Sequence, residues 1–227
     1  MKLLNHIISL IKGERFELDD SIPFTYIFRF FVSKVISLIW GIIRFHQLKL
    51  CFVHPTTIIK CESQFKFGKN LSIGRDCYID ALSERGFECG DNCSIGCHTH
   101  ISLTGSLKFL GKGLKLGNNV GLGTHGYYGS GMGFCEIGDD TIIGNFVSVH
   151  PENHNYEKID VPIRMQGVNG KGIKIGNNCW IGSKVTILDG TIVGNGCIIA
   201  AGAVVKGVFP DNVIIGGIPA KIIKKRI

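Results

Sequence analysis

The sequence lacks several features that would assign it to a common class of protein. Its nine cysteines include no C-x-x-C pair, and the nucleophile motif G-x-S-x-G is absent. No small-x-small cleavage site follows a leader, so we expect no secretory signal peptide. No basic and aromatic platform for nucleic acid appears, although the net charge is +7. That charge instead favours a phosphate-bearing cofactor or an anionic membrane face.

Long uninterrupted hydrophobic runs are also missing. Residues 24–45 are strongly apolar, but Arg29, Lys34 and Arg44 interrupt them, and the longest charge-free piece has nine residues, Val35–Ile43. A spanning helix needs about 20 mostly apolar residues. We therefore expect a helix that either covers the open edge of a β-structure or lies on the inner face of a membrane.

An aliphatic residue returns at every sixth position in the last third of the chain. The series is Ile175, Ile181, Ile187, Val193, Ile199 and Val205. Neither a helix, with period 3.6, nor a single strand, with period 2, gives this spacing. A chain that coils so that equivalent positions stack does give it. The sequence predicts an all-β solenoid over residues 58–227, preceded by an N-terminal helical and apolar segment, residues 1–57, in which residues 2–12 also have a helical pattern.

The cysteines fit this repeat. Cys77, Cys93, Cys179 and Cys197 occupy its fifth position, where a small apolar side chain is expected. Cys89, Cys93 and Cys97 are spaced by four, like metal ligands, but the repeat points them in different directions. We expect core-filling thiols in a reducing compartment, the cytoplasm, with a metal or redox role as the alternative.

Two interruptions of the repeat predict loops. About nine residues within 124–136 and a longer stretch at 150–174 are too many for the coil. Long loops on rigid scaffolds are usually functional. The longer one begins His150-Pro-Glu-Asn153-His154 and returns to the coil before Trp180.

These motifs resemble those of the hexapeptide-repeat acyltransferases, and within that group the maltose, galactoside and polysaccharide O-acetyltransferases. The resemblance is carried by a His at the start of the loop, Pro162-Ile163, the stretch Ile175-Gly-Asn-Asn-Cys-Trp180-Ile-Gly and the ending Gly217-Ile-Pro-Ala-Lys221. It covers roughly residues 58–227. It implies a left-handed parallel β-helix, acetyl-CoA as co-substrate, no metal, and a trimer with active sites between subunits.

The same resemblance implies roles for single residues. His154 would be the general base, a role that suits an imidazole at neutral pH. Trp180 would form a wall for the pantetheine arm, or else pack between subunits. His125, His150 and Asn153 would contact the acceptor. The remaining positions expected to contact acetyl-CoA are Ser183, Ala201, Lys206, Lys221 and Lys224.

The predicted function is an O-acetyltransferase acting on a sugar hydroxyl of a surface-polysaccharide precursor (capsule or O-antigen). The enzyme would be cytoplasmic, with the N-terminal segment placing it against the membrane. Three alternatives stay open from the sequence: N-acetylation of an amino-sugar, a zinc enzyme like the γ-type carbonic anhydrases, and a β-helix that serves only as a scaffold.

Overall fold

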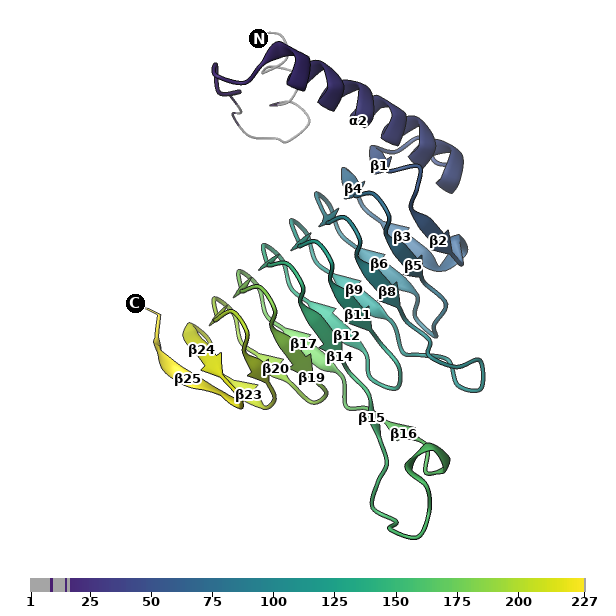
Figure 1. Cartoon of the computed structure of the whole chain (residues 1–227), viewed down its shortest axis with the longest axis vertical. Helices are drawn as coiled ribbons and strands as arrows, with labels where there is room; N and C mark the ends of the chain where they lie inside the picture. The colour runs from purple at the N-terminus through teal and green to yellow at the C-terminus, as the bar shows by residue number, and fades with distance from the viewer. Residues whose placement is uncertain (1–8, 10–14, 16, 227) are drawn as a thin grey trace.

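The computed structural model describes Ser9, Arg15 and residues 17–226, and its main body is a three-sided column of short parallel strands (Figure 1). Three sheets of nine, seven and seven strands form the sides. Equivalent positions of successive repeats pair with one another, so that Ile181 lies between Ile143 and Ile199. This stacking confirms the predicted left-handed β-helix of hexapeptide repeats. The helical pattern at residues 2–12 lies almost wholly outside the described residues.

One turn of the column, here called a coil, contributes one strand to each sheet. Sheet A consists of β1 (Cys51–Val53), β4 (Leu71–Ile73), β7 (Ser94–Ile95), β10 (Gly121–Leu122), β13 (Ile142–Ile143), β18 (Trp180–Ile181), β21 (Ile198–Ile199), β24 (Val213–Gly217) and β25 (Ala220–Lys225). Sheet B consists of β2 (Ile58–Lys60), β5 (Tyr78–Asp80), β8 (His100–Ser102), β11 (Tyr127–Gly129), β14 (Ser148–His150), β19 (Thr186–Leu188) and β22 (Val204–Val205). Sheet C consists of β3 (Phe65–Phe67), β6 (Phe87–Cys89), β9 (Leu114–Leu116), β12 (Cys135–Ile137), β17 (Ile173–Ile175), β20 (Ile192–Val193) and β23 (Val208–Phe209). A short 3-10 helix, η1 (Glu62–Gln64), lies in the first coil.

The aliphatic residues of the repeat point inward and form one continuous core. The fifth-position cysteines lie in that core, as predicted, and their thiols also donate to carbonyls of the next coil. Cys93 Sγ lies 3.1 Å from the oxygen of Gly117, and Cys179 Sγ lies 3.3 Å from that of Gly194. Thr141 makes the same contact with Gly176. The position therefore accommodates a small donor, although Val185 and Ala203 fill it in other coils. Burial raises the pKa of Cys179 to about 11.

The three corners of the column differ in chemistry. At the C–A corner, which joins sheet C to sheet A, Asn or Asp side chains in the left-handed conformation form a ladder, as in Asn92 Nδ2 to Asn119 Oδ1 at 3.0 Å. At the B–C corner the chain makes its excursions, at residues 81–86, 103–113, 130–134 and 151–172. The A–B corner carries rings and charged side chains, described below.

Two predicted boundaries differ from the structure. The β-helix begins at Cys51, not at residue 58, because β1 already pairs with β4. The shorter loop is 130–134, not 124–136, because residues 124–129 form a regular corner and strand β11. Tyr128 is wholly buried and takes the place of the expected aliphatic residue. Because tyrosine is not aliphatic, the repeat that contains Tyr128 is not recognised from the spacing of aliphatic residues.

Helix α2 (Phe24–Phe45) lies across the open end of the first coil, and the hairpin of β24 and β25 lies at the other end (Figure 1). Gly41 allows α2 to approach β1 closely, since a Cβ there would overlap the carbonyl oxygen of Cys51. Phe45 inserts between Phe65 and Phe67, with ring centroids 5.3 and 4.7 Å away. These contacts fix α2 on the column.

Candidate functional site

The longest excursion from the B–C corner is an ordered hairpin. Strands β15 (Asn153–His154) and β16 (Val168–Asn169) pair antiparallel, with His154 opposite Val168, and a 3-10 turn, η2 (Ile163–Met165), lies in its tip. Gln166 Nε2 donates to the carbonyls of Lys158 and Val161, both at 2.7 Å. The bonds brace the loop internally, so it presents a defined surface.

Asp189, buried at the B–C corner of the next coil, fastens the foot of this loop. Its Oδ1 accepts hydrogen bonds from the backbone N–H groups of Lys171 and Gly172 at 2.7 and 2.8 Å. Its Oδ2 accepts one from Asn153 Nδ2 at 2.8 Å. The carboxylate thus holds both ends of the loop, and it fixes the residue next to His154.

A cavity of about 400 Å³ opens at this foot. His154, exposed to solvent, lines it together with Lys206 from the B–C corner of the last coil. Its other lining residues are Asn153, Tyr156, Glu157, Asn169, Lys171, Asp189, Gly190 and Gly207. The cavity therefore combines an accessible imidazole with ammonium groups, which suits proton transfer beside an anionic ligand.

The other predicted site residues lie elsewhere on the column. Trp180 projects from β18 on sheet A, 54% exposed, between Ile142 and Ile198. Ser183 and Ala201 lie one coil apart at the A–B corner. Lys221 and Lys224 lie on β25, opposite Gly216 and Ile214. One chain therefore brings Lys206 to His154 but leaves these five residues on a different side.

Comparison with known proteins agrees with the repeat. Residues 172–207 match the family model "Bacterial transferase hexapeptide (six repeats)". The chain is 29% identical over 174 residues, 74% of each protein, to the putative lipopolysaccharide biosynthesis O-acetyl transferase WbbJ of Escherichia coli (strain K12). It is 31% identical over 122 residues to the galactoside O-acetyltransferase of the same organism, spanning 48% of this chain and 55% of that protein. Residues 172–207 therefore carry the hexapeptide repeat of bacterial transferases, and the chain resembles O-acetyltransferases that bear it.

A solved structure has the same fold. A point mutant of AntD, an N-acyltransferase from Bacillus cereus, in complex with dTDP and coenzyme A, superposes with a TM-score of 0.58. It is 21% identical and the match covers 71% of this chain and 84% of that one.

Two of the predicted acceptor residues of this acyltransferase do not line the cavity. His125 was expected to open a loop, but it lies in the regular A–B corner with its ring between those of His98 and Phe146. His150 belongs to β14 on sheet B, where its ring stacks on Tyr127 with centroids 5.4 Å apart, and desolvation by its neighbours lowers its pKa. Both belong to the coil because the shorter loop starts later and the longer loop starts only at Pro151.

The sequence analysis missed Asp189 and Lys171. One indication of Asp189 was available: Leu188 follows Ile187 where four of the other five repeats have Gly or Ala, and an acid comes next. Within the described part of the chain, no three His, Cys, Asp or Glu side chains are arranged so as to hold a metal ion.

Proposed function

We propose that the protein transfers the acetyl group of acetyl-CoA to a sugar hydroxyl in a precursor of a surface polysaccharide (capsule or O-antigen). The observation that carries the proposal is the position of His154, which is exposed in a cavity at the foot of a braced loop. Asp189 holds the two ends of this loop together. The names of the two Escherichia coli relatives support acetyl transfer to an oxygen, and WbbJ supports lipopolysaccharide as the context.

The reaction requires a base because a hydroxyl is a poor nucleophile. The imidazole of His154 takes the proton of the acceptor hydroxyl while its oxygen bonds to the thioester carbonyl carbon. The carbon–sulfur bond then breaks, and the proton on His154 passes to the leaving thiolate of coenzyme A. Backbone N–H groups of a neighbouring coil are suitable donors for the oxyanion that forms in between.

The residues present fit acetyl-CoA, whose phosphates require cations and whose pantetheine arm requires an apolar wall. Lys206, Lys221 and Lys224 supply the charge, and Trp180 supplies a wall. Ser183 and Ala201 lie at a corner where the coils approach closely, since a Cβ on Gly182 would lie 2.6 Å from the nitrogen of Ala201. With small residues at this corner, an extended ligand such as the pantetheine arm can lie along the coils.

The separation of these residues from His154 favours a site shared between copies. Sheet C has a solvent-facing surface of ion pairs, such as Lys66–Glu88 at 3.1 Å and Lys115–Glu136 at 3.3 Å. Sheet A exposes Ile142 and Trp180, and on sheet C it is only the last two strands that expose aliphatic side chains, Ile192 and Val208. A symmetric neighbour would cover these apolar residues and bring its cofactor groove to this chain's loop. We propose a homotrimer in the cytoplasm, where the nine unpaired cysteines would stay reduced.

The test combines product analysis with light scattering. Incubation with acetyl-CoA and a panel of nucleotide sugars and polysaccharide repeat units should give a product heavier by one acetyl group and labile to mild base, as an ester is. A base-stable amide would identify an N-acetyltransferase. No transfer and no binding of acetyl-CoA would favour a scaffold, and a stable monomer would overturn the shared site.

A further inference from the structure

Helix α2 exposes an apolar stripe along its outer side. Its buried residues are Ile27, Ser37, Gly41 and Phe45. Apolar side chains at spacings of three and four follow a line about a quarter turn round the helix from these, and all are exposed: Phe24, Phe28, Phe31, Val35 and Ile39. With 22 residues the helix is about 33 Å long, so the stripe is large for a surface exposed to water.

Helix α2 carries three basic residues, Arg29, Lys34 and Arg44, and no acidic one. Arg44 is paired with Glu62 of the first coil at 2.8 Å, so Arg29 is the charge of α2 that remains for an anionic surface. The helix is long and apolar enough to cross a bilayer, with mean hydropathy 1.7 in its best window. However, Lys34 Nζ is bonded to Ser72 Oγ at 3.0 Å, and Gly41 packs on β1, so one side is committed to the column. A helix with one side docked and an exposed apolar stripe beside that side suits a position in the membrane interface.

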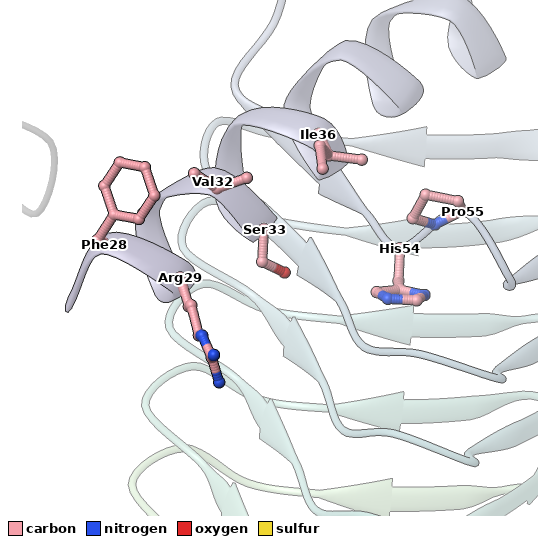
Figure 2. A pocket seen from close by; sticks show the side chains of 7 residues that line it. All are labelled: Phe28, Arg29, Val32, Ser33, Ile36, His54 and Pro55. Carbon is pink, nitrogen blue, oxygen red and sulfur yellow. The ribbon is translucent and has the colours of Figure 1, made fainter. Parts of the chain in front are cut away.

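A groove of about 410 Å³ lies between α2 and the first coil (Figure 2). Its lining is mostly apolar: Phe28, Val32, Ile36 and Pro55, with Ser33, Arg29 and His54 as polar members. In Figure 2 the side chains of Arg29 and His54 both extend below α2, on the side of the following coils. The groove thus offers room for a hydrocarbon chain, with a cation and an imidazole at its edge.

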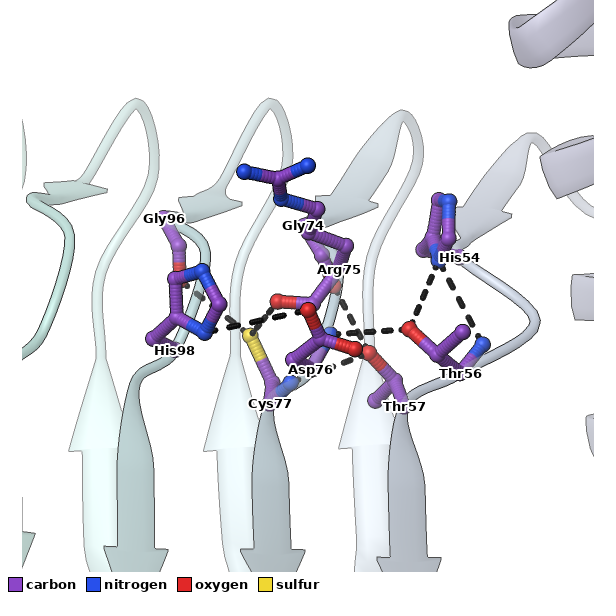
Figure 3. A network of polar contacts seen from close by, with 9 residues as sticks. All are labelled: His54, Thr56, Thr57, Gly74, Arg75, Asp76, Cys77, Gly96 and His98. Carbon is purple, nitrogen blue, oxygen red and sulfur yellow. Dashed lines mark hydrogen bonds and ion pairs between the residues drawn. The ribbon is translucent and has the colours of Figure 1, made fainter.

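The edge of the groove is the start of the A–B corner, where a polar network continues along the column (Figure 3). His54 Nδ1 lies 2.9 Å from Thr56 Oγ1, which accepts the N–H of Asp76 at 3.0 Å. Asp76 Oδ2 lies 3.8 Å from His98 Nδ1. The hydrogen bond with Thr56 is the main cause that lowers the pKa of Asp76, so this carboxylate is an acceptor at neutral pH.

A stack of rings extends the corner beyond His98. The ring of His125 lies 4.7 Å from that of His98, and the ring of Phe146 lies 4.8 Å from His125. Because the faces stack on one another, the ring edges turn away from the stack, and apart from His98 Nδ1, which faces Asp76, their nitrogens can bind hydroxyl groups. All three residues have a positive φ, near 59°, which is unfavourable for a residue as bulky as Phe146.

The fold itself does not require rings here. At the C–A corner Asn119 and Asn178 adopt the same backbone conformation, and Asn is a residue type that tolerates it. The ring stack ends beside Lys184 and Ser183, where the proposed cofactor groove begins. From His54 to Phe146 the corner crosses four strand spacings of ~4.8 Å, about 19 Å in all. It therefore connects the groove under α2 with the proposed cofactor groove, to which the loop of a neighbouring copy would bring its His154.

We propose that α2 holds the protein on an anionic membrane and that the acceptor is a saccharide joined through a phosphate to a lipid chain. Its lipid end occupies the groove under α2, its phosphate lies by Arg29 and His54, and its saccharide follows the A–B corner past His98 and Phe146. This substrate class rests on the proposed acetyl transfer, but its binding is measurable without turnover.

The first experiment measures membrane binding of the full chain by co-sedimentation with vesicles of phosphatidylcholine or of equimolar phosphatidylcholine and phosphatidylglycerol. The protein should sediment with the anionic vesicles, and the double variant Phe31→Ser, Val35→Ser should stay in solution. Leu107→Ser, which changes an 85% exposed residue in another loop, should sediment like the parent. Equal sedimentation of the double variant, or a change in its oligomeric state instead, would show that lipid is not what covers the stripe.

The second experiment adds undecaprenyl phosphate to the phosphatidylcholine vesicles. Sedimentation should rise, whereas undecaprenol should have no effect and excess inorganic phosphate should not compete. Arg29→Gln and His54→Ala should abolish the rise. If undecaprenol acts equally, or if both variants respond normally, the groove does not recognise a lipid phosphate. Neither result depends on catalysis, so failure here is separate from failure of the proposed acetyl transfer.

The saccharide end is tested by Phe146→Asn in the acetyl-transfer assay. Asn suits the backbone, so the melting temperature should not fall, while KM for the acceptor should rise about tenfold with kcat nearly unchanged. Asn119→His, in the same coil as His125 but at the C–A corner, is the matched control and should leave KM unchanged. An unaltered KM in Phe146→Asn would remove the corner from the acceptor path.

Discussion

The carboxylate of Asp189 accepts a 2.8 Å hydrogen bond from the amide of Asn153, the residue that precedes His154. The same carboxylate receives the backbone N–H groups of Lys171 and Gly172, where the chain returns to the column. A single buried side chain therefore closes the loop at its foot and limits the movement of the proposed base. The same hydrogen bonds therefore stabilise the coil and position His154.

Replacement of Asp189 should affect both properties. In Asp189→Asn one acceptor oxygen becomes an amide donor, which faces N–H groups that it cannot bind. The free energy of unfolding should fall by about 1–3 kcal/mol, as expected for unsatisfied buried donors. Because His154 is then less well placed, kcat should fall at least tenfold while KM for acetyl-CoA changes little. Denaturant titration and steady-state kinetics measure the two effects.

Asp211→Asn provides the matched control. Asp211 accepts the N–H of Asn195 at 2.8 Å from the next coil, but at the C–A corner and away from the loop. We expect a smaller loss of stability there and an unchanged kcat. If Asp189→Asn loses stability without any loss of kcat, Asp189 does not position the base.

Tyr128 should be a site of easy stabilisation. Its side chain is wholly buried, and within the described residues its hydroxyl has no hydrogen-bond partner. Burial accordingly raises its pKa far above the ordinary range. Tyr128→Phe removes the unpaired group at almost constant volume, so the free energy of unfolding should rise by about 1 kcal/mol. A lower melting temperature or a lower denaturant midpoint in Tyr128→Phe would instead indicate that a buried water binds the hydroxyl.

The fold could be predicted from the sequence because the period of the sequence repeat equals the period of the strands in the coil. Each coil places its aliphatic residue over that of the previous coil, as Ile143, Ile181 and Ile199 show. The residues that recur in the sequence are therefore the ones that contact each other in space. The inward cysteines were predictable for the same reason. Where an unusual residue fills the position, as Tyr128 does, the repeat was lost and the shorter loop was placed too early.

The arrangement of the site was less accessible from the sequence. The repeat shows that Trp180 points outward, but spacing along the chain does not show that sheet A and the B–C corner face different directions. Nor did it show that His98, His125 and Phe146 would stack at one corner, since they are 27 and 21 residues apart and only the coil lengths bring them together. Contacts across coils depend on the exact number of residues in each excursion.

The three lysines expected to bind the phosphates of acetyl-CoA should differ from the base in their kinetic effect. Lys206, Lys221 and Lys224 lie in segments open to solvent, so each contact with a phosphate is screened by salt. Each Lys→Ala change should raise KM for acetyl-CoA about threefold to tenfold and leave kcat nearly intact. The effect should shrink as salt is added. Lys115→Ala on sheet C is the control, and unchanged KM in all three variants would place the phosphates elsewhere.

The strongest prediction concerns His154. Its side chain is exposed, and its place in the hairpin depends on the backbone pairing with Val168, so His154→Ala should keep the fold, the oligomeric state and acetyl-CoA binding. If the imidazole takes the proton of the acceptor hydroxyl, kcat should fall by roughly 10²–10⁴-fold, the usual contribution of a general base. Circular dichroism, light scattering and steady-state kinetics on one preparation separate these properties.

His150 provides the internal control for that result, because it is the other histidine near the start of the loop. It lies on sheet B against Tyr127 and does not line the cavity, so His150→Ala should reduce kcat much less. The parent enzyme should show an ascending limb in its pH–rate profile, and His154→Ala should lose this limb. If His150→Ala abolishes turnover while His154→Ala is near normal, the base belongs to the coil and not to the loop. Near-normal turnover in both variants would leave the acetyl transfer without an imidazole base and would require a different mechanism.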